Sequence, residues 1–402
     1  MAIRVLRIIN RFVISGSTFN VSYLTKYLPS EFETVLISGH KDDGEENSDY
    51  LAASFGLNPV YVNSMRKSLT QPWNDRNAFK EIKKIIETFK PHIVHTHAAK
   101  AGFVGRLAAI SCNVPIVLHT FEGHYFHSYF HPIKTNVLLR IERYLAAKTD
   151  GIIAISPEQY DDLANIYKVA SPEKVFTLPI GLDIDKFTLN TDRLRADFRN
   201  EFKISDDTIC IGIIGRLVPI KNLNMFVRVV KEVLQRTNKK VKFFIVGDGE
   251  SREDTERQLE QLNLAYTSVH EKDYSKPVIF TSWRKDIDCI MAGIDIVALT
   301  SLNEGTPVAL MEAQAAKKAI VSTNVGGIGY VVEDGKSALL AESNNVKDFS
   351  DKLLTLIENE SLRNEMGQFG YENAQAKFSL NRFINDTKNL YHKLLQEKGV
   401  KI

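Results

Sequence analysis

The fold class of this chain is decided by the stretch Cys210-Ile211-Gly212-Ile213-Ile214-Gly215-Arg216-Leu217-Val218-Pro219-Ile220-Lys221-Asn222. Its first five residues form a short apolar run, which is typical of a strand buried on both faces. Gly215 then permits a tight exit from that strand. A helical pattern of apolar residues follows at once over Asn222–Thr237. A buried strand that leads directly into a helix is the repeating unit of a parallel α/β sheet.

The same alternation fills the chain on both sides of this stretch. In the N-terminal half we expect strands at Ile3–Ile9, Thr34–Ser38, Ile93–Thr96, Ile116–Thr120 and Gly151–Ile155, and helices at Thr18–Leu28, Asn77–Phe89, Gly102–Ser111 and Pro132–Ala147. In the C-terminal half we expect further strands at Val241–Val246, Val278–Phe280, Ile296–Leu299 and Ala319–Ser322, and helices at Arg252–Leu262, Ile287–Ala292 and Pro307–Ala316, with the last long helices beginning near Val346 and Ser379. The sequence therefore predicts two doubly wound α/β domains, and the polar stretch Asp183–Thr208 is predicted to link them.

Composition excludes several other classes of protein. The chain has 402 residues, which suits two or three domains at about 150 residues each. Its formal net charge is +2, so it has no strong basic field for nucleic acid. Three widely spaced cysteines argue against a disulfide framework, and no apolar run reaches the roughly 18 residues of a membrane-spanning helix. We therefore expect a globular protein of the reducing cytoplasm.

The decisive stretch also carries candidate ligand-binding residues. Arg216 and Lys221 place two cations beside the start of the predicted helix, in the loop that follows Gly215. Free backbone N–H groups, the positive end of a helix dipole and charged donors together favour phosphate. The alternative is that both cations are solvated surface residues.

A second candidate motif is Glu304-Gly305-Thr306-Pro307-Val308-Ala309-Leu310-Met311-Glu312. Pro307 suits the first turn of a helix, and Thr306 is expected to cap it. The two carboxylates can each accept hydrogen bonds from hydroxyl groups, and the amides of Gly305, Thr306 and Val308 favour an anion. The alternative is helix-capping electrostatics for Glu304 and a solvated Glu312.

These two motifs together resemble the retaining sugar-nucleotide glycosyltransferases of glycosyltransferase family 4, which have the GT-B fold. Further segments look like the family's motifs: Leu178–Phe187, Val246–Gly249, Val325–Gly327 and Val332–Gly335. His95–Gly102 is similar to a subgroup that builds bacterial surface polysaccharides. The resemblance covers nearly the whole chain. It implies two Rossmann-like domains that face each other across a cleft, an acceptor domain at 1–185 with a returning helix at 380–402, and a donor domain at 186–379.

The resemblance also implies roles for individual residues. Arg216 and Lys221 are expected to hold the donor diphosphate, Glu304 the donor sugar and Glu312 the ribose. Further donor-binding positions are Gly16, Gly215, Gly247, Trp283, Arg284, Gly305, Thr306 and Val308, with the Thr281–Arg284 loop beside the base. The donor is a nucleotide-diphosphate sugar, with UDP expected from the family, and no cofactor is implied.

Two segments depart from the family pattern. Many relatives have Thr-x-His-Gly where this chain has Thr120-Phe121-Glu122-Gly123-His124, and Gly-Gly where it has Ser15-Gly16-Ser17. We expect Glu122 or His124 to act on the acceptor side, with Lys100 as a cation that could pair with Glu122.

The histidines raise a separate question of metal binding. Six of them lie in one region: His95, His97, His119, His124, His127 and His131. The spacings of His95 with His97 and of His127 with His131 suit zinc, but no Cys or Asp lies close to them in sequence. We expect no metal, and expect His119 to be a core residue.

The function that we expect is retaining transfer of a hexosyl group to a glycan or polyprenyl-linked acceptor in polysaccharide biosynthesis. The alternatives are a non-hydrolysing UDP-sugar 2-epimerase and a nucleotide-sugar-binding subunit with weakened chemistry. The basic, partly apolar segment Lys134–Lys148 either covers the first sheet or also contacts the inner face of the plasma membrane.

Overall fold

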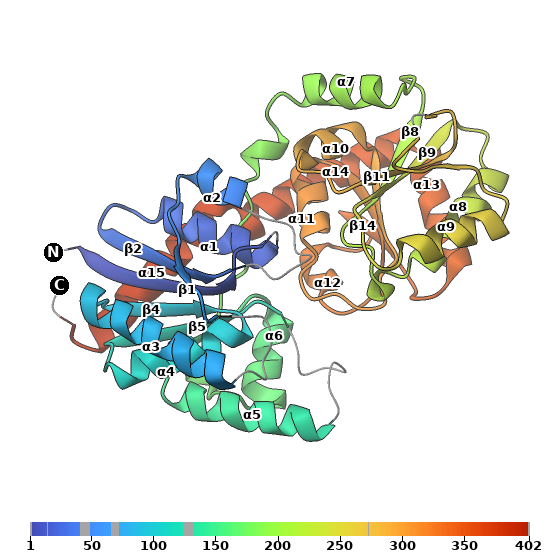
Figure 1. The fold of residues 1–402 in the computed structure, drawn as a ribbon. Coiled ribbons are helices and arrows are strands. Elements are labelled where there is room, and N and C mark those ends of the chain that lie inside the picture. Colours follow the sequence, from blue (N-terminus) through green and yellow to red (C-terminus); the bar gives the residue numbers. More distant parts are fainter. Residues whose placement is uncertain are drawn as a thin grey trace. The chain divides into compact units, whose positions relative to one another are not determined.

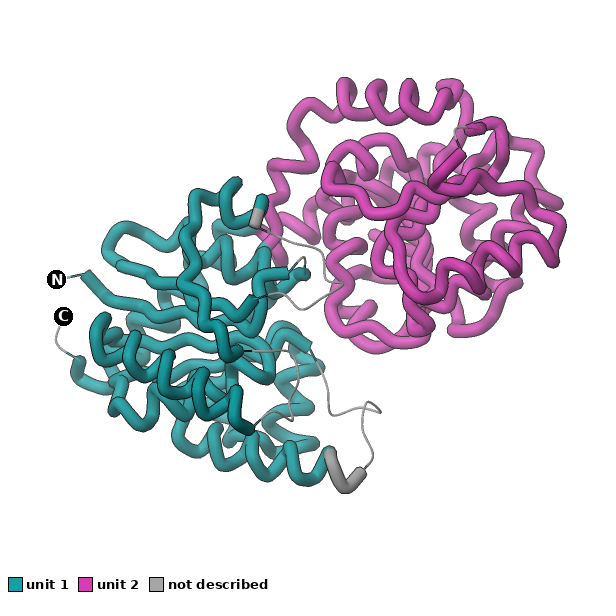
Figure 2. Tube along the Cα trace, viewed as in Figure 1, with its two compact units in different colours: residues 1–181, 380–402 teal, residues 182–379 magenta. Residues whose placement is uncertain are grey.

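The computed structural model describes residues 2–13, 15–40, 49–65, 72–123, 132–271 and 273–400. The chain forms two compact units (Figure 2), unit 1 with Met1–Gly181 and Leu380–Ile402, and unit 2 with Leu182–Ser379. The boundary falls after residue 181, whereas the sequence predicted it after residue 185. The last helix, α15 (Leu380–Glu397), belongs to unit 1, as the GT-B resemblance predicts.

Unit 1 is built on a seven-stranded parallel sheet with the order β3-β2-β1-β4-β5-β6-β7. Its strands are β1 (Ile3–Arg11), β2 (Phe32–Gly39), β3 (Val60–Val62), β4 (Ile93–His97), β5 (Ile116–Phe121), β6 (Gly151–Ala154) and β7 (Val175–Thr177). Its other α-helices are α1 (Gly16–Tyr27), α2 (Asp49–Phe55), α3 (Pro72–Phe89), α4 (Ala99–Ser111), α5 (Pro132–Ala147) and α6 (Pro157–Asp161). The strand order reverses between β1 and β4, and such a reversal creates a crevice at the carboxyl ends of the strands.

Both faces of this sheet are covered by helices (Figure 1) because β1 is apolar on both sides. Leu6 and Ile8 pack in one core cluster with residues of α3 and α4. Ile3 and Val5 pack in another cluster with Tyr391 and neighbouring residues of α15. The doubly wound architecture predicted from the strand–helix alternation is thereby confirmed for unit 1.

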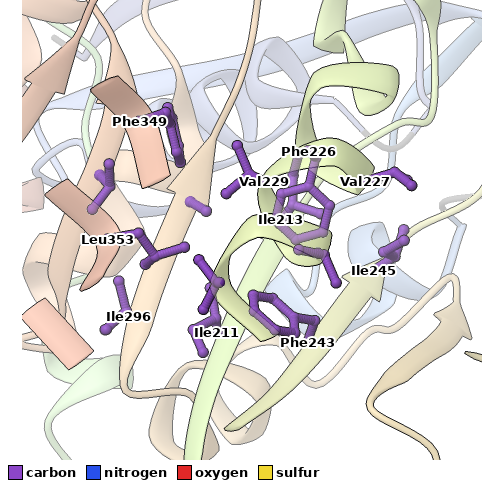
Figure 3. Close-up of a cluster of buried hydrophobic side chains, with 14 of the residues drawn as sticks. Ile211, Ile213, Phe226, Val227, Val229, Phe243, Ile245, Ile296, Phe349 and Leu353 are labelled. Atoms are coloured by element: carbon purple, nitrogen blue, oxygen red, sulfur yellow. The ribbon is translucent and has the colours of Figure 1, made fainter. Parts of the chain in front are cut away.

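Unit 2 repeats this plan with a second parallel sheet of order β10-β11-β9-β8-β12-β13-β14. Its strands are β8 (Ile209–Ile214), β9 (Val241–Val246), β10 (Tyr266–Thr267), β11 (Val278–Ser282), β12 (Ile296–Leu299), β13 (Ala319–Thr323) and β14 (Ala338–Ala341). Its α-helices are α7 (Thr191–Glu201), α8 (Leu223–Arg236), α9 (Arg252–Gln261), α10 (Ile287–Gly293), α11 (Val308–Ala315), α12 (Ile328–Val331), α13 (Val346–Glu358) and α14 (Glu360–Phe378). Figure 3 shows part of the core between the sheet and its helices, where Ile211, Phe226 and Phe349 are fully buried. Here the strand order reverses between β8 and β12.

The prediction that Asp183–Thr208 is only a linker is wrong. This segment contains α7, whose Phe198 is fully buried and lies 5.0 Å from the ring of Phe244. Arg195 of the same helix forms an ion pair with Asp295 at 2.7 Å. The helix is therefore part of unit 2. Helix α14 and the short strands β3, β7, β10 and β14 were also not predicted.

No described helix combines the length and apolar character needed to cross a membrane.

Candidate functional site

Two glycine loops meet at the carboxyl edge of the unit 2 sheet. Gly215 follows β8 with a φ of 142°, and Gly247 follows β9 with a φ of 130°. A Cβ atom on Gly247 would lie 2.0 Å from the carbonyl oxygen of Gly215, so the loop after β9 can pass this close only because residue 247 has no side chain. This edge flanks the β8–β12 reversal, where α/β sheets bind ligands.

Lys221 and Glu304 meet at this edge although 83 residues separate them. The ammonium group of Lys221 lies 2.5 Å from Oε1 of Glu304, and Ser301 donates a hydrogen bond to the same oxygen at 2.6 Å. Glu304 Oε2 accepts no hydrogen bond from the described residues, and the lysine has two further protons. The pair can therefore bind a hydroxyl group through the carboxylate and a phosphate through the ammonium group at the same time.

The backbone beside Glu304 offers unused donors. The amides of Gly305, Thr306 and Val308 donate no hydrogen bond within the described chain. Helix α11 begins at Val308, and Pro307, without a side-chain hydrogen bond, occupies the N-cap position. Thr306 is therefore not the cap, and that prediction is wrong. Uncapped N–H groups at a helix start attract anions.

A pair of glycines supports this loop from behind. The amide of Gly327 donates to the carbonyl oxygen of Glu304 at 2.9 Å. A Cβ on Gly326 would lie 2.1 Å from that same oxygen. The Gly326-Gly327 motif thus fixes the backbone from which the Glu304 side chain projects.

Glu312 lies one turn further along α11 and has no hydrogen-bond or ion-pair partner among the described residues. Part of its surface is exposed, yet burial of the carboxyl group raises its pKa to about 7, against the opposing effect of Lys186. A carboxyl group that has no partner and a pKa near 7 is suited to hydrogen bonding with a diol. No contact among the described residues joins Glu312 to the Lys221–Glu304 pair.

The other unit 2 residues that are predicted to bind the sugar donor differ in whether their side chains already have partners. Arg216 is exposed and has no ion-pair partner among the described residues. Trp283 is 50% exposed and follows Ser282, whose carbonyl oxygen accepts from Gly247. Arg284 instead forms ion pairs with Glu201 and Asp286, which raise its pKa. Of the residues predicted to flank the base, Trp283 is thus the one whose side chain is free for stacking.

In unit 1 the segment Ser15-Gly16-Ser17 starts helix α1. The Ser15 hydroxyl accepts a hydrogen bond from the amide of Thr18 and so caps the helix. Gly16 is the first helical residue, beside the carboxyl end of β1, and is partly exposed. Nothing in the described contacts assigns a ligand to it, and its role stays a prediction.

His95 belongs to a buried network rather than to an open site. The Tyr391 hydroxyl lies 2.7 Å from His95 Nδ1 and accepts a hydrogen bond from Arg7 at 3.1 Å. His95 Nδ1 is therefore the acceptor, and Nε2 donates to the Thr120 hydroxyl at 2.7 Å. Burial lowers the pKa of His95 well below its ordinary value.

His97 and Glu122 form a second buried pair. His97 Nδ1 lies 2.8 Å from Glu122 Oε1, and the two side chains are 2% and 10% exposed. The predicted pairing of Glu122 with Lys100 is wrong, because Lys100 forms an ion pair with Asp75. His119 is buried against Gly102, as expected of a core residue.

Part of the histidine region cannot be compared with the predictions, because His124, His127 and His131 lie outside the described residues. Among the residues that are described, no group of three or more His, Cys, Asp or Glu side chains is arranged to hold a metal ion.

Two residues of these sites were missed in the sequence. Ser301 could have been found, because Thr300-Ser301 is a polar pair directly after the apolar strand β12. Tyr391 could not, because it reaches His95 from 296 residues away.

Comparison with known proteins decides the family. Residues 14–186 match the model of Glycosyltransferase Family 4, and residues 195–373 match that of Glycosyl transferases group 1. The D-inositol 3-phosphate glycosyltransferase of Corynebacterium jeikeium is 30% identical over 75% of this chain and 72% of its own length. The chain belongs to glycosyltransferase family 4. It is thus a glycosyltransferase, and the 2-epimerase alternative is set aside.

Other known proteins resemble the chain over greater lengths. The UDP-Gal:alpha-D-GlcNAc-diphosphoundecaprenol alpha-1,3-galactosyltransferase of Escherichia coli is 28% identical over 81% of each chain. The crystal structure of a glycosyltransferase from Rickettsia africae has a TM-score of 0.78 at 18% identity, over 98% of this chain and 99% of its own. The Anabaena protein HepE in complex with UDP gives 0.78 at 17% identity, over 97% and 100%. At these identities the two structures show the GT-B fold alone.

Proposed function

We propose that this family 4 member is a retaining glycosyltransferase that moves a hexose from a UDP-sugar to a glycan or lipid-linked acceptor in polysaccharide biosynthesis. Unit 2 binds the donor in this proposal and unit 1 binds the acceptor. The observation that carries it is the Lys221–Glu304 pair beside three unused backbone amides. A UDP donor and a lipid-linked acceptor are supported by the name of the Escherichia coli relative.

Each donor group has a proposed partner with matching chemistry. Lys221 and Arg216 bind the diphosphate together with the amides of Gly305, Thr306 and Val308. Glu304 accepts hydrogen bonds from the sugar hydroxyls, and Glu312 from the ribose. Gly215 and Gly247 let the diphosphate approach the backbone, and Trp283 and Arg284 flank the base. No resident cofactor is needed.

The proposed reaction is a displacement on one face of the donor sugar. The acceptor hydroxyl attacks the anomeric carbon from the side on which the diphosphate leaves, so the new C–O bond has the configuration of the old one. The acceptor proton passes to the departing diphosphate oxygen. No side chain acts as nucleophile, and Lys221 lowers the barrier by stabilising the charge that develops on the leaving group.

A lipid-linked acceptor requires access to a membrane, and α5 offers a surface for it. Its inner residues Leu139 and Ala146 are buried in the core of unit 1. Its outer side exposes Val137, Arg140, Tyr144 and Lys148, and Ile166 and Lys168 lie exposed in the segment after α6. We call these six residues the α5 patch.

A groove of about 670 Å³ adjoins the α5 patch and is lined mainly by apolar residues. Arg143, Lys168 and Lys174 also line it. Cations around an apolar surface favour the interface of an anionic lipid bilayer. The proposal is peripheral contact with such a bilayer, with the helix also covering the sheet.

The deciding experiment measures transfer from UDP-galactose, UDP-glucose and UDP-N-acetylglucosamine to polyprenyl-diphosphate-linked N-acetylglucosamine. Lys221→Ala and Glu304→Gln are expected to lower turnover at least about 100-fold, since each removes a preorganised charge at the reacting group. Lys336→Ala is the matched control, because it breaks an exposed Lys–Glu pair of the same unit. NMR of the anomeric proton reports retention.

Three outcomes would count against the proposal. Wild-type turnover in both site variants would rule out the proposed donor site. A product with inverted anomeric configuration would rule out the proposed retaining mechanism. Nucleotide binding without transfer to any acceptor, with transfer restored by Glu122→His, would instead identify a nucleotide-sugar-binding subunit.

A further inference from the structure

A small cavity lies at the carboxyl edge of the unit 1 sheet, beside the β1–β4 reversal. Its polar lining includes Asn20 of α1, His97 at the end of β4, Glu122 after β5 and Thr387 of α15. The space open to the centre of a water-sized group is about 10 Å³. That volume suits one water molecule or one hydroxyl group and is too small for a sugar ring.

Two polar side chains that line this cavity have groups without a hydrogen-bond partner among the described residues. His97 is 1% exposed, and its Nε2 atom is buried without a hydrogen bond among the described residues. Asn20 is 4% exposed, and its side-chain amide makes no hydrogen bond within the described chain. Buried polar groups normally have partners, because leaving them unpaired is costly. The buried, unpaired Nε2 atom of His97 therefore indicates a ligand at this cavity, which the Asn20 side chain also lines.

The hydrogen bond to Glu122 fixes what His97 presents to the cavity. A carboxylate accepts, so Nδ1 of His97 carries the proton and donates to Glu122 Oε1 at 2.8 Å. Burial lowers the pKa of His97 even though Glu122 opposes that shift, so the ring is neutral near pH 7. Nε2 is then a hydrogen-bond acceptor, while the Asn20 amide can donate.

The buried residue His119 provides a contrast. It too has an Nε2 atom without a partner, and its Nδ1 lies 2.9 Å from the Thr96 hydroxyl. That ring packs against Gly102 and does not line the cavity. His97 therefore differs from His119 in lining a cavity, and Asn20 lines the same cavity.

We propose that Asn20 and His97 form a subsite for a single hydroxyl group of a sugar acceptor, with Glu122 as the residue that positions His97. A hydroxyl group both donates, here to His97 Nε2, and accepts, here from the Asn20 amide. An ammonium ion could only donate, and a phosphodiester could only accept. This inference rests on the proposed function, in which unit 1 binds the acceptor.

Variants of the two histidines separate the subsite from a structural role in the transfer assay described above. His97→Asn keeps a donor for Glu122 and removes the unpaired ring nitrogen, so the acceptor KM is expected to rise about tenfold, the factor for one hydrogen bond. The donor KM should not change. His97→Gln returns a polar atom to the Nε2 position and should recover part of the loss. His119→Asn, the matched control, should leave both KM values unchanged.

A binding measurement decides the inference even if no transfer is found. In the full chain labelled with ¹⁵N-histidine, N-acetylglucosamine is expected to shift His97 Nε2 and leave His119 Nε2 unchanged. An unchanged His97 signal, or equal effects of His97→Asn and His119→Asn on the acceptor KM, would mean that a permanent water fills the cavity and would overturn the subsite. Absent transfer with a shifted His97 signal would count against the proposed reaction and leave the subsite intact.

Discussion

At the scale of single residues, Gly305 is a glycine that the fold does not require but that a bound ligand would require. A Cβ on Gly305 would meet no atom within 4 Å, and its φ is not positive. No described residue therefore demands glycine there, in contrast to Gly326, where a Cβ would strike the Glu304 carbonyl. If a diphosphate packs against this backbone, the added methyl group obstructs it.

We therefore expect Gly305→Ala to unfold at the wild-type temperature but to bind UDP at least about tenfold more weakly. Thermal unfolding without ligand and calorimetric titration with UDP measure the two quantities. Gly326→Ala should behave differently and lower the unfolding temperature itself, since its φ of 51° is strained for alanine. Unchanged UDP affinity in Gly305→Ala would show that the diphosphate does not bind against this loop.

Glu312 gives a prediction for the dependence of stability on pH. Its pKa rises from the ordinary 4.5 to about 7 on folding, so the folded chain binds this proton more tightly than the unfolded chain. The contribution of this group to the free energy of unfolding is therefore fully present below about pH 4.5 and is lost as pH rises through 7. The loss is at most about 3.4 kcal/mol, at 1.36 kcal/mol for each pKa unit.

Because glutamine does not ionise, Glu312→Gln is expected to become more stable relative to the wild type as pH rises from 5 to 8. Urea unfolding at both values measures the difference. Parallel pH profiles for the two proteins would show that the carboxyl group is ordinarily solvated.

The residue types that form the site could be predicted from the sequence. The pairing of these residues could not. Lys221 and Glu304 stand at strand–helix junctions, and that position alone indicated a ligand site. Their direct ion pair depends on the neighbouring placement of β8 and β12 and could not be seen in the chain order. The two ion pairs of Arg284, with Glu201 and Asp286, likewise could not be seen in the chain order.

At the scale of elements, α7 shows where the polar pattern misled us. The helix has only three apolar residues among eleven, Leu194, Ala196 and Phe198, so its sequence suggested a solvated linker. It is held instead by one deeply buried aromatic ring and by two arginines that contact Asp295. The edge strands β3, β7 and β10 were missed for another reason: each has only two or three residues, too few to show an alternating pattern.

The structure therefore predicts that α7 contributes to the stability of unit 2. Phe198→Ala should lower the free energy of unfolding by about 3–5 kcal/mol, the usual cost of removing a buried phenylalanine. Leu189→Ala is the control, since Leu189 precedes the same helix and is 62% exposed. Denaturant unfolding of both variants measures the contrast, and equal stabilities would mean that α7 is only loosely attached.

At the scale of the whole molecule, the chain passes between its two units twice, and the two passages are paired. Leu182 donates a backbone hydrogen bond to Phe378, which ends α14. Arg382, in the first turn of α15, donates to the carbonyl oxygens of Pro179 and Ile180. The sequence predicted that the last helix returns to the first domain, but only the structure shows that the outgoing and returning segments hold each other.

The proposed contact with a bilayer concerns the full chain and is tested on it. Binding to vesicles that contain anionic phospholipid should be measurable by sedimentation, should weaken as salt screens the cations, and should be absent with neutral lipid. Tyr144→Asp combined with Ile166→Asp should lower the bound fraction several-fold, because each change places a negative charge on an apolar contact of the α5 patch. Trp73→Asp is the matched control, since Trp73 is 75% exposed but lies on α3, outside the patch. If Trp73→Asp reduces binding as much as the patch variant, the interaction is non-specific. If the wild-type protein does not bind anionic vesicles, α5 serves only to cover the sheet.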